Sequence, residues 1–242
     1  MHDTTVVLTS CGRQDLLELT IDSFLRFNTA PLDRFIIIED GPMARNSRLM
    51  AKFQDDRFLW LATGQRIGQI RAIDLAYQHV RTPYIFHCED DWEFYAGGFI
   101  ELSRTVLEHN DAWLQVYIRA LDDIYGHPLF DDTHRAGSAT YRVLRHDWDA
   151  QFYGLWHGFA FNPGLRRLSD YRRIAPYSHR VAFDPEKPWE AERQLSEQYK
   201  TLGYFATILT ANDGRGFVRH TGDLRHVGPD AMLPADASPV DE

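Results

Sequence analysis

The sequence has few of the features that mark secreted or membrane-spanning proteins. Its 242 residues include two cysteines, Cys11 and Cys88, too few for a disulfide framework, so we expect both to be reduced. No apolar run approaches the roughly 20 residues needed to cross a bilayer. The N-terminus lacks the basic, apolar and small-residue segments of a signal peptide. We therefore expect a cytoplasmic protein without a transmembrane segment, with peripheral attachment to a membrane as the alternative.

The chain also lacks an excess of positive charge and has none of the common glycine-rich phosphate-binding loops. It has 26 Lys and Arg residues against 35 Asp and Glu, a formal net charge of −9, which opposes a sequence-independent grip on phosphates. We expect no nucleic-acid binding. The first apolar run is followed by Ser-Cys-Gly-Arg rather than G-x-G-x-x-G, and no G-x-x-x-x-G-K-[ST] run occurs. A dehydrogenase is therefore disfavoured and a P-loop enzyme is excluded.

The N-terminal half alternates between strand-like and helix-like segments. Short β-branched or apolar runs predict strands at 4–9, 35–38, 57–61 and 84–88. The segments between them carry apolar residues at helical spacing, with the last predicted helix at 64–80. Such strand–helix units build an α/β fold, in which helices cover both faces of a mainly parallel sheet.

The second half is less regular, and its pattern does not fix a topology. Helical spacing indicates a helix at 98–109, and Asn162-Pro163 is suited to cap and begin another. A later helix at 189–202 ends at Gly203, which is followed by a strand at 204–209. We expect a single domain over 1–228, with a nucleotide-binding half at 1–91, an acceptor and catalytic half at 92–228, and a flexible tail at 229–242.

Acidic residues dominate the predicted strand ends, where ligands of such sheets bind. Glu39 and Asp40 follow the second strand, and Glu89, Asp90 and Asp91 follow the fourth. Adjacent carboxylates raise one another's pKa values unless a cation compensates, and Mg²⁺ or Mn²⁺ binds through one or two carboxylates plus substrate phosphates. Spaced two apart on extended backbone, Glu89 and Asp91 would point the same way. The alternative is a solvated loop that caps the next helix.

Four segments together resemble glycosyltransferase family 2. Residues 6–13 are similar to the first strand and turn of that family, 36–41 to its strand with a terminal acidic pair and Gly, and 64–76 to its Gly-containing helix. Residues 89–91 stand at the place of the Asp-x-Asp metal motif, with Glu89 for the first Asp. The resemblance covers about 4–91 well and extends weakly to 227. It implies a GT-A (Rossmann-like) three-layer sandwich.

The resemblance implies an enzyme that uses a nucleotide-diphosphate sugar, with a UDP-sugar favoured. A divalent metal, Mn²⁺ or Mg²⁺, would neutralise the diphosphate as it leaves. The acceptor would be a glycan, a lipid-linked molecule or a protein. Residues that match the family's donor-binding segments, or that stand where they could contact phosphates, are Thr9, Ser10, Arg13, Glu39, Asp40, Arg66, Arg71 and Asp90.

An inverting transferase also needs a general base that takes the proton of the acceptor hydroxyl. The resemblance places it in an acidic pair that opens a late helix, where Glu192 is the candidate and Glu190 the reserve. Two residues apart on a helix, their side chains diverge by about 200°, so both cannot face one substrate. The alternative is that both acids only complement the helix dipole.

A late histidine completes the metal shell in several GT-A enzymes, and His220 is better placed for this than His226. A lone histidine is more often a structural hydrogen-bonding group. The aromatic segment 156–161 has two interpretations as well, stacking on a sugar or packing in the core.

Other functions remain open from the sequence. They are a retaining transferase on the same fold, a sugar nucleotidyltransferase, whose Gly-rich basic loop is absent here, and a non-catalytic nucleotide-sugar-binding module that keeps Asp40 but lacks the metal.

Overall fold

The structure is a computed structural model, and it describes residues 2–151, 154–182, 187 and 189–222. The expected tail at 229–242 and His226 lie outside the described residues. None of the helices in these ranges combines the length and the apolar character needed to span a bilayer.

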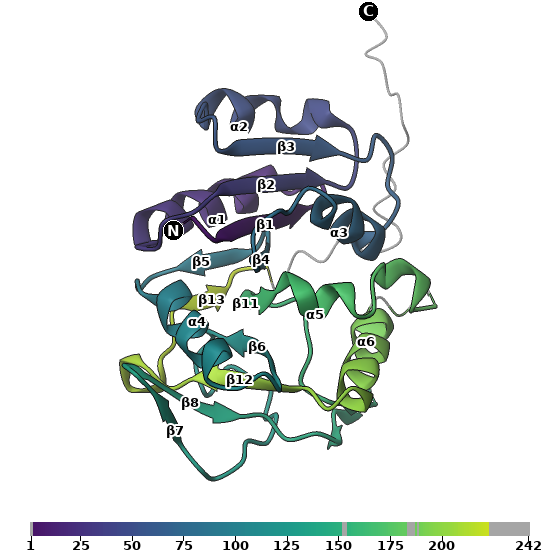
Figure 1. The fold of residues 1–242 in the computed structure, drawn as a ribbon. Coiled ribbons are helices and arrows are strands. Elements are labelled where there is room, and N and C mark those ends of the chain that lie inside the picture. The colour runs from purple at the N-terminus through teal and green to yellow at the C-terminus, as the bar shows by residue number, and fades with distance from the viewer. Residues whose placement is uncertain (1, 152–153, 183–186, 188, 223–242) are drawn as a thin grey trace, which may run out of the picture.

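The first half forms the parallel part of the sheet. Strands β3, β2, β1 and β4 lie side by side in that order, and all pair in parallel (Figure 1). The four strands predicted from the sequence are confirmed. The elements of this half are β1 (Thr4–Ser10), α1 (Gln14–Phe27), β2 (Arg34–Glu39), η1 (Met43–Asn46), α2 (Ser47–Lys52), β3 (Phe58–Ala62), α3 (Gln69–Tyr77) and β4 (Tyr84–Glu89).

The second half continues the same sheet in the order β4-β11-β6-β12-β8-β7. Strands β6 and β12 run in the direction of β4, whereas β11 and β8 run the opposite way. The elements of this half that matter below are β5 (Trp92–Phe94), α4 (Phe99–His109), β6 (Trp113–Tyr117), β7 (His134–Ala136), β8 (Ala139–Val143), β10 (Leu155–Trp156), β11 (Gly164–Arg167), α5 (Leu168–Arg172), α6 (Trp189–Thr201), β12 (Phe205–Leu209) and β13 (Val218–His220).

Two sequence expectations about helix starts are wrong. Asn162-Pro163 does not begin a helix, because Gly164 starts β11, which pairs with strands on both sides. These long-range pairings override the local capping pattern. Helix α3 begins at Gln69 rather than near 64, because the Asp40 carboxylate binds the backbone amides of Ile67 and Gly68 in the preceding loop.

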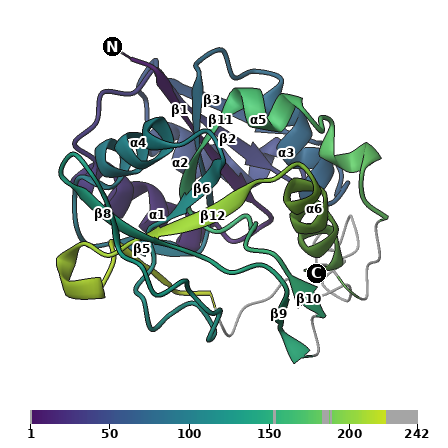
Figure 2. The same cartoon turned by 60° about the horizontal axis from the view of Figure 1, so that its bottom comes forward.

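Helices cover both faces of the sheet, which confirms the three-layer α/β sandwich (Figures 1 and 2). One apolar core packs α1, α2 and α4 against the sheet through residues such as Phe24, Leu49 and Val106. The other packs α3, α5 and α6 through residues such as Ile73 and Leu195. Both cores are continuous along the sheet, so the carboxyl ends of its strands are fixed relative to one another.

A small second sheet carries the end of the described chain back to the acidic segment. Strand β13 pairs antiparallel with β5, which directly follows Asp91, and His220 is the register partner of Trp92. The Thr221 amide and hydroxyl then donate to the Asp91 carbonyl oxygen at 2.8 and 2.9 Å. This pairing places His220 beside the acids.

Gly164 gives a direct test of the antiparallel insertion of β11. A Cβ atom at this position would lie 2.6 Å from the Val116 carbonyl oxygen of β6. Gly164→Ala is expected to lower the free energy of unfolding, measured by urea denaturation, by about 1–3 kcal/mol. In a helix the same change would stabilise the protein by up to about 1 kcal/mol, so the opposite sign would contradict the strand.

Candidate active site

The acidic strand ends meet at one edge of the sheet, as the sequence predicted. Strand β1 lies between β2 and β4, with Ser10 in register with Glu39 and Thr9 in register with Glu89. Thr9 and Ser10 are buried at the end of β1. The turn after β1, the end of β2 and the end of β4 therefore surround one region, which we call the acidic edge.

Arg13 compensates part of the acidic charge from within the protein. It lies just before α1, and its guanidinium binds both Asp90 oxygens and, at 2.8 Å, Asp91 Oδ2. Asp90 is fully buried, and this burial raises its pKa to about 6 although the Arg13 charge opposes the shift. A protein cation thus supplies part of the compensation for which the sequence suggested a metal.

Asp91 has one carboxylate oxygen that could accept an additional ligand. Its Oδ2 lies 3.2 Å from His220 Nε2, whereas its buried Oδ1 has no hydrogen-bond partner among the described residues. Burial raises the pKa of Asp91, but the hydrogen bond from His220 and the charge of Arg13 outweigh this and keep the pKa below its usual value. Asp91 is therefore an anion next to an imidazole.

Glu89 differs from Asp91 in its surroundings. Its Oε1 accepts a 2.7 Å hydrogen bond from Gln69, and its Oε2 accepts one of 3.4 Å from the Trp92 indole. Burial, Asp91 and Glu192 all raise the pKa of Glu89. Within the described ranges, no group of three or more His, Cys, Asp or Glu side chains is arranged to hold a metal ion. Metal binding by Glu89 remains a prediction.

Glu39 and Asp40 shape the loops that border the acidic edge. Glu39 Oε1 accepts the Gly12 amide at 2.8 Å. Asp40 accepts the amides of Ile67 and Gly68 at 2.8 and 2.9 Å and the Thr63 hydroxyl at 3.1 Å. The loop before α3 is therefore built around Asp40. A further contact of either acid with a nucleotide remains a prediction.

The other two predicted phosphate contacts lie on exposed positions. Arg66 belongs to the loop before α3 and Arg71 to α3 itself. The charge of Arg66 reaches the turn after β1, where it opposes the rise that burial causes in the pKa of the Cys11 thiol. Arg66 is thus placed toward the acidic edge.

The two candidate bases of α6 have different environments. Glu192 is largely buried, and its Oε1 accepts the Phe161 amide. Burial raises its pKa to about 7, while the Phe161 amide and Arg166 oppose the shift. Glu190 instead binds Arg193 Nε through both oxygens, at 3.0 and 2.9 Å, and Arg193 lowers its pKa. Glu192 can exchange a proton near neutral pH, whereas Glu190 is an ion-paired anion.

The sequence reading overlooked Arg119, which lies just after β6 and borders the same edge. Its guanidinium lies 4.8 Å from the Trp92 ring centre and 5.0 Å from that of Tyr125, and it binds Asp123 and Asn162. The strand-end rule, applied to the predicted strand at 113–118, would have identified this residue.

Of the aromatic residues in the segment 156–161, Phe159 and Phe161 pack in the core.

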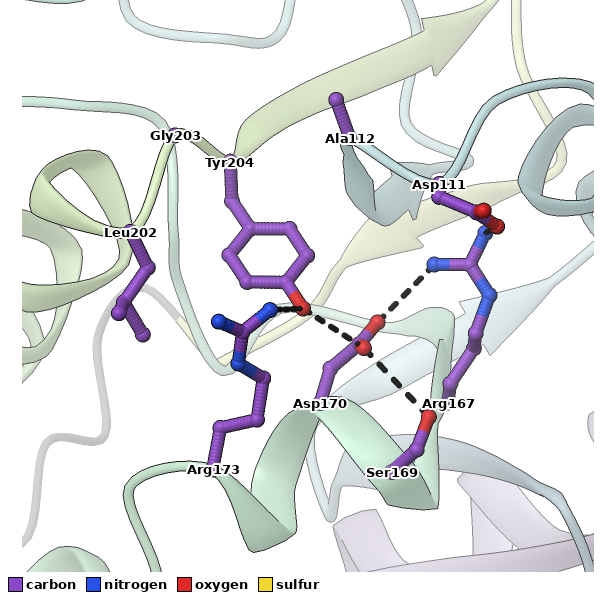
Figure 3. A pocket seen from close by; sticks show the side chains of 9 residues that line it. All are labelled: Asp111, Ala112, Arg167, Ser169, Asp170, Arg173, Leu202, Gly203 and Tyr204. Atoms are coloured by element: carbon purple, nitrogen blue, oxygen red, sulfur yellow. Dashed lines mark hydrogen bonds and ion pairs between the residues drawn. The ribbon is translucent and has the colours of Figure 1, made fainter.

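A hollow of about 450 Å³ lies at the opposite edge of the sheet, where β6 and β12 begin (Figure 3). Its polar groups bind one another: Asp170 accepts hydrogen bonds from Tyr204 at 2.9 Å and Arg167 at 3.0 Å, and Arg173 donates to the Tyr204 hydroxyl at 3.0 Å. Such mutual pairing indicates a structural network. The acidic edge, with its shifted carboxyl groups, remains the candidate active site.

Comparison with solved structures identifies the fold class. TarS 1-349 from S. aureus in complex with UDP-GlcNAc is 9% identical, with a TM-score of 0.61 over 91% of this chain and 61% of that chain. Mannosyltransferase PcManGT from Pyrobaculum calidifontis, in complex with GDP-Man and Mn²⁺, is 12% identical, with a TM-score of 0.58 over 84% of this chain and 53% of that chain. GalNAc-T7 with UDP, GalNAc and Mn²⁺ is 12% identical, with a TM-score of 0.62 over 90% of this chain and 43% of that chain.

These likenesses define a GT-A fold of the kind found in glycosyltransferases, and the chain spans 43–61% of the length of those three proteins. The family model for Glycosyl transferase family 2 matches residues 5–162. Because this match covers well over half of the sequence, the chain belongs to glycosyl transferase family 2. No curated protein sequence matches it.

The raised pKa of Glu192 predicts a pH-dependent stability. The folded protein binds the Glu192 proton more tightly than the unfolded chain, so this stabilisation is complete below the usual pKa of Glu and is lost as pH rises through about 7. Glu192→Gln should therefore gain about 1–3 kcal/mol relative to wild type between pH 5 and pH 8.5. Urea denaturation at the two pH values measures this change.

Glu190→Gln is the matched control on the same helix. Because Arg193 lowers the pKa of Glu190, its ionised form is favoured by folding, and removing it should give no gain at high pH. An equal effect of Glu192→Gln at both pH values would contradict the buried, proton-exchanging carboxyl group.

Proposed function

We propose that the protein transfers a sugar from a nucleotide-diphosphate donor, a UDP-sugar being favoured, to a hydroxyl group of a glycan, lipid-linked or protein acceptor. The transfer depends on a divalent metal and inverts the anomeric centre. The observation that carries this proposal is the position of the Glu192 carboxyl group, which accepts the Phe161 amide beside the acidic edge and whose pKa burial raises to about 7. Family membership and the nucleotide sugars bound by TarS and PcManGT support the donor class.

Glu192 has the properties of a general base. A group with a pKa near the working pH combines a sizeable ionised fraction with enough basicity to take a proton. The Phe161 amide fixes Oε1, while Oε2 has no hydrogen-bond partner in the described part of the chain. Oε2 would accept the proton of the acceptor hydroxyl as its oxygen attacks the sugar. The charge of Glu192 raises the pKa of Glu89, which supports their closeness.

The acidic edge fits a divalent metal through Asp91 and His220. The unpartnered Oδ1 of Asp91 and the neighbouring imidazole nitrogen combine a hard oxygen donor with a nitrogen donor, a set that suits Mn²⁺. PcManGT and GalNAc-T7 contain Mn²⁺ in their solved complexes. When bound, the metal would neutralise the diphosphate leaving group. Arg13, already on Asp91, would add a second positive charge near the phosphates.

Donor binding tests the metal site. Wild-type protein should bind UDP at least ten times more tightly in the presence of MnCl₂ than in its absence, as measured by calorimetry, because Asp91 would hold a cation that neutralises the charge of the diphosphate. Asp91→Asn should lose this gain. Asp56→Asn, an exposed position between α2 and β3, should keep it. Equal UDP affinity of the wild type with and without MnCl₂ would rule out the metal assignment.

Turnover tests the base. With Mn²⁺ present, wild-type protein is screened for sugar release to water from UDP-GlcNAc, other UDP-sugars and GDP-mannose. Removal of a general base costs about 10²–10⁴-fold in rate, so Glu192→Gln should lose at least 100-fold in turnover while its affinity for UDP changes less than twofold. Glu197→Gln, an exposed acid on the same helix, should retain activity. Normal turnover of Glu192→Gln would show that another group acts as base.

A further inference from the structure

Arg166 is a buried cation, and none of the described residues forms a direct ion pair with it. It lies on β11, is 2% exposed, and faces Ile85 of β4 and Gln115 of β6 in the register. No carboxylate of the described residues lies within 4 Å of its guanidinium. An arginine keeps its charge in any protein environment, and an uncompensated buried charge strongly destabilises a fold. Something nearby must therefore offset this charge.

The aromatic side chains around Arg166 offset its positive charge only in part. The guanidinium carbon lies 5.2 Å from the Phe159 ring centre and 5.8 Å from that of Phe161, distances at which an aromatic face attracts a cation. Four tyrosines also surround it, and their hydroxyl groups are neutral because burial raises their pKa values: Tyr77, Tyr117, Tyr177 and Tyr199. None of them supplies a negative charge.

One peptide group connects Arg166 to Glu192. An Arg166 side-chain nitrogen donates to the Ala160 carbonyl oxygen at 3.3 Å, and the Phe161 N–H of that same peptide group donates to Glu192 Oε1. A cation thus lies at the negative end of the peptide dipole and an anion at its positive end. Hydrogen bonds in such a chain polarise and strengthen one another.

We propose that Arg166 is a positioning residue that acts on Glu192 through the 160–161 peptide group, fixing the carboxyl group and favouring its ionised form. A role of Arg166 in catalysis rests on the proposed function, whereas its electrostatic effect on Glu192 does not. When Glu192 is ionised, its negative charge in turn offsets part of the charge of the buried guanidinium. With Glu192 ionised, the two side chains stabilise each other through the peptide group between them.

The other groups that act on Glu192 are few in the described structure. Glu89 on β4 repels the ionised form, and the Tyr117 hydroxyl on β6 interacts with it but stays neutral. On α6 itself, Glu190 is neutralised by Arg193. Arg166 is consequently the cation that favours ionised Glu192 against burial and Glu89.

The Phe161 amide proton reports directly on this arrangement. Because it binds Glu192, its NMR chemical shift should titrate with the carboxyl group, and the assignment is verified by loss of the titration in Glu192→Gln. In Arg166→Met we expect the midpoint to rise by at least one pH unit, in Arg166→Lys by less than half as much. The exposed Arg172→Met should leave it unchanged. An unchanged midpoint in Arg166→Met would overturn the proposal.

A measurement on wild type keeps the proposal testable if Arg166→Met does not fold. The Arg166 Nε–H resonance should titrate with the same midpoint as the Phe161 amide and should become pH-independent in Glu192→Gln. A pH-independent Arg166 resonance in wild type would overturn the proposal.

Kinetics then separates this inference from the proposed function. The acidic limb of the pH profile of kcat should move in Arg166→Met by the same amount as the NMR midpoint, with the KM for the donor unchanged. A shifted midpoint together with full turnover of Glu192→Gln would refute the base but retain the Arg166 coupling. An inactive Glu192→Gln together with an unshifted midpoint in Arg166→Met would support Glu192 as the base and refute the Arg166 coupling.

Discussion

The structure depends on how negative charge is kept stable at the edge of a buried sheet. Glu89, Asp90, Asp91 and Glu192 gather at this edge, where Asp90, Asp91 and Glu192 raise the pKa of Glu89 and Asp91 raises that of Asp90. The acids differ in the partners that the protein provides for them. Arg13 binds Asp90 and Asp91, whereas in the described part of the chain no cation pairs directly with Glu89 or Glu192, whose pKa values burial raises further. This division separates the two acids that pair with Arg13 from the two acids that bind a proton more readily.

The first half of the fold could be predicted because its information is local. Each strand is a short apolar run ended by a turn, and the end of each run shows which side chains reach the ligand edge. Glu39, Asp40 and the 89–91 acids were located in this way. The direction of β11 was not predictable, because it depends on pairing with β4 and β6, which are distant in the sequence. Local signals at Asn162-Pro163 indicated a helix instead.

The sequence predicted which residue types gather at the candidate site, but not the contacts between their side chains. The strand-end position of Asp91 and the family resemblance for His220 and Glu192 made these residues candidates, but neither could show that Arg13 binds two of the acids or that Asp40 organises the loop before α3. These are side-chain contacts between segments far apart in the chain. Arg166 escaped notice for a related reason, since an arginine is expected at the surface and only the packed structure shows it enclosed.

The position of His220 in the site depends on the pairing of β13 with β5. His220 reaches Asp91 only when a three-residue strand docks more than a hundred residues away from its own position in the chain. Short peripheral strands are among the first elements to open in native proteins. Local opening of β13 would withdraw the imidazole together with the buried Val218 side chain while the nine-stranded sheet stays paired, so any ligand that contacts both Asp91 and His220 would also protect the β13 amides from hydrogen exchange.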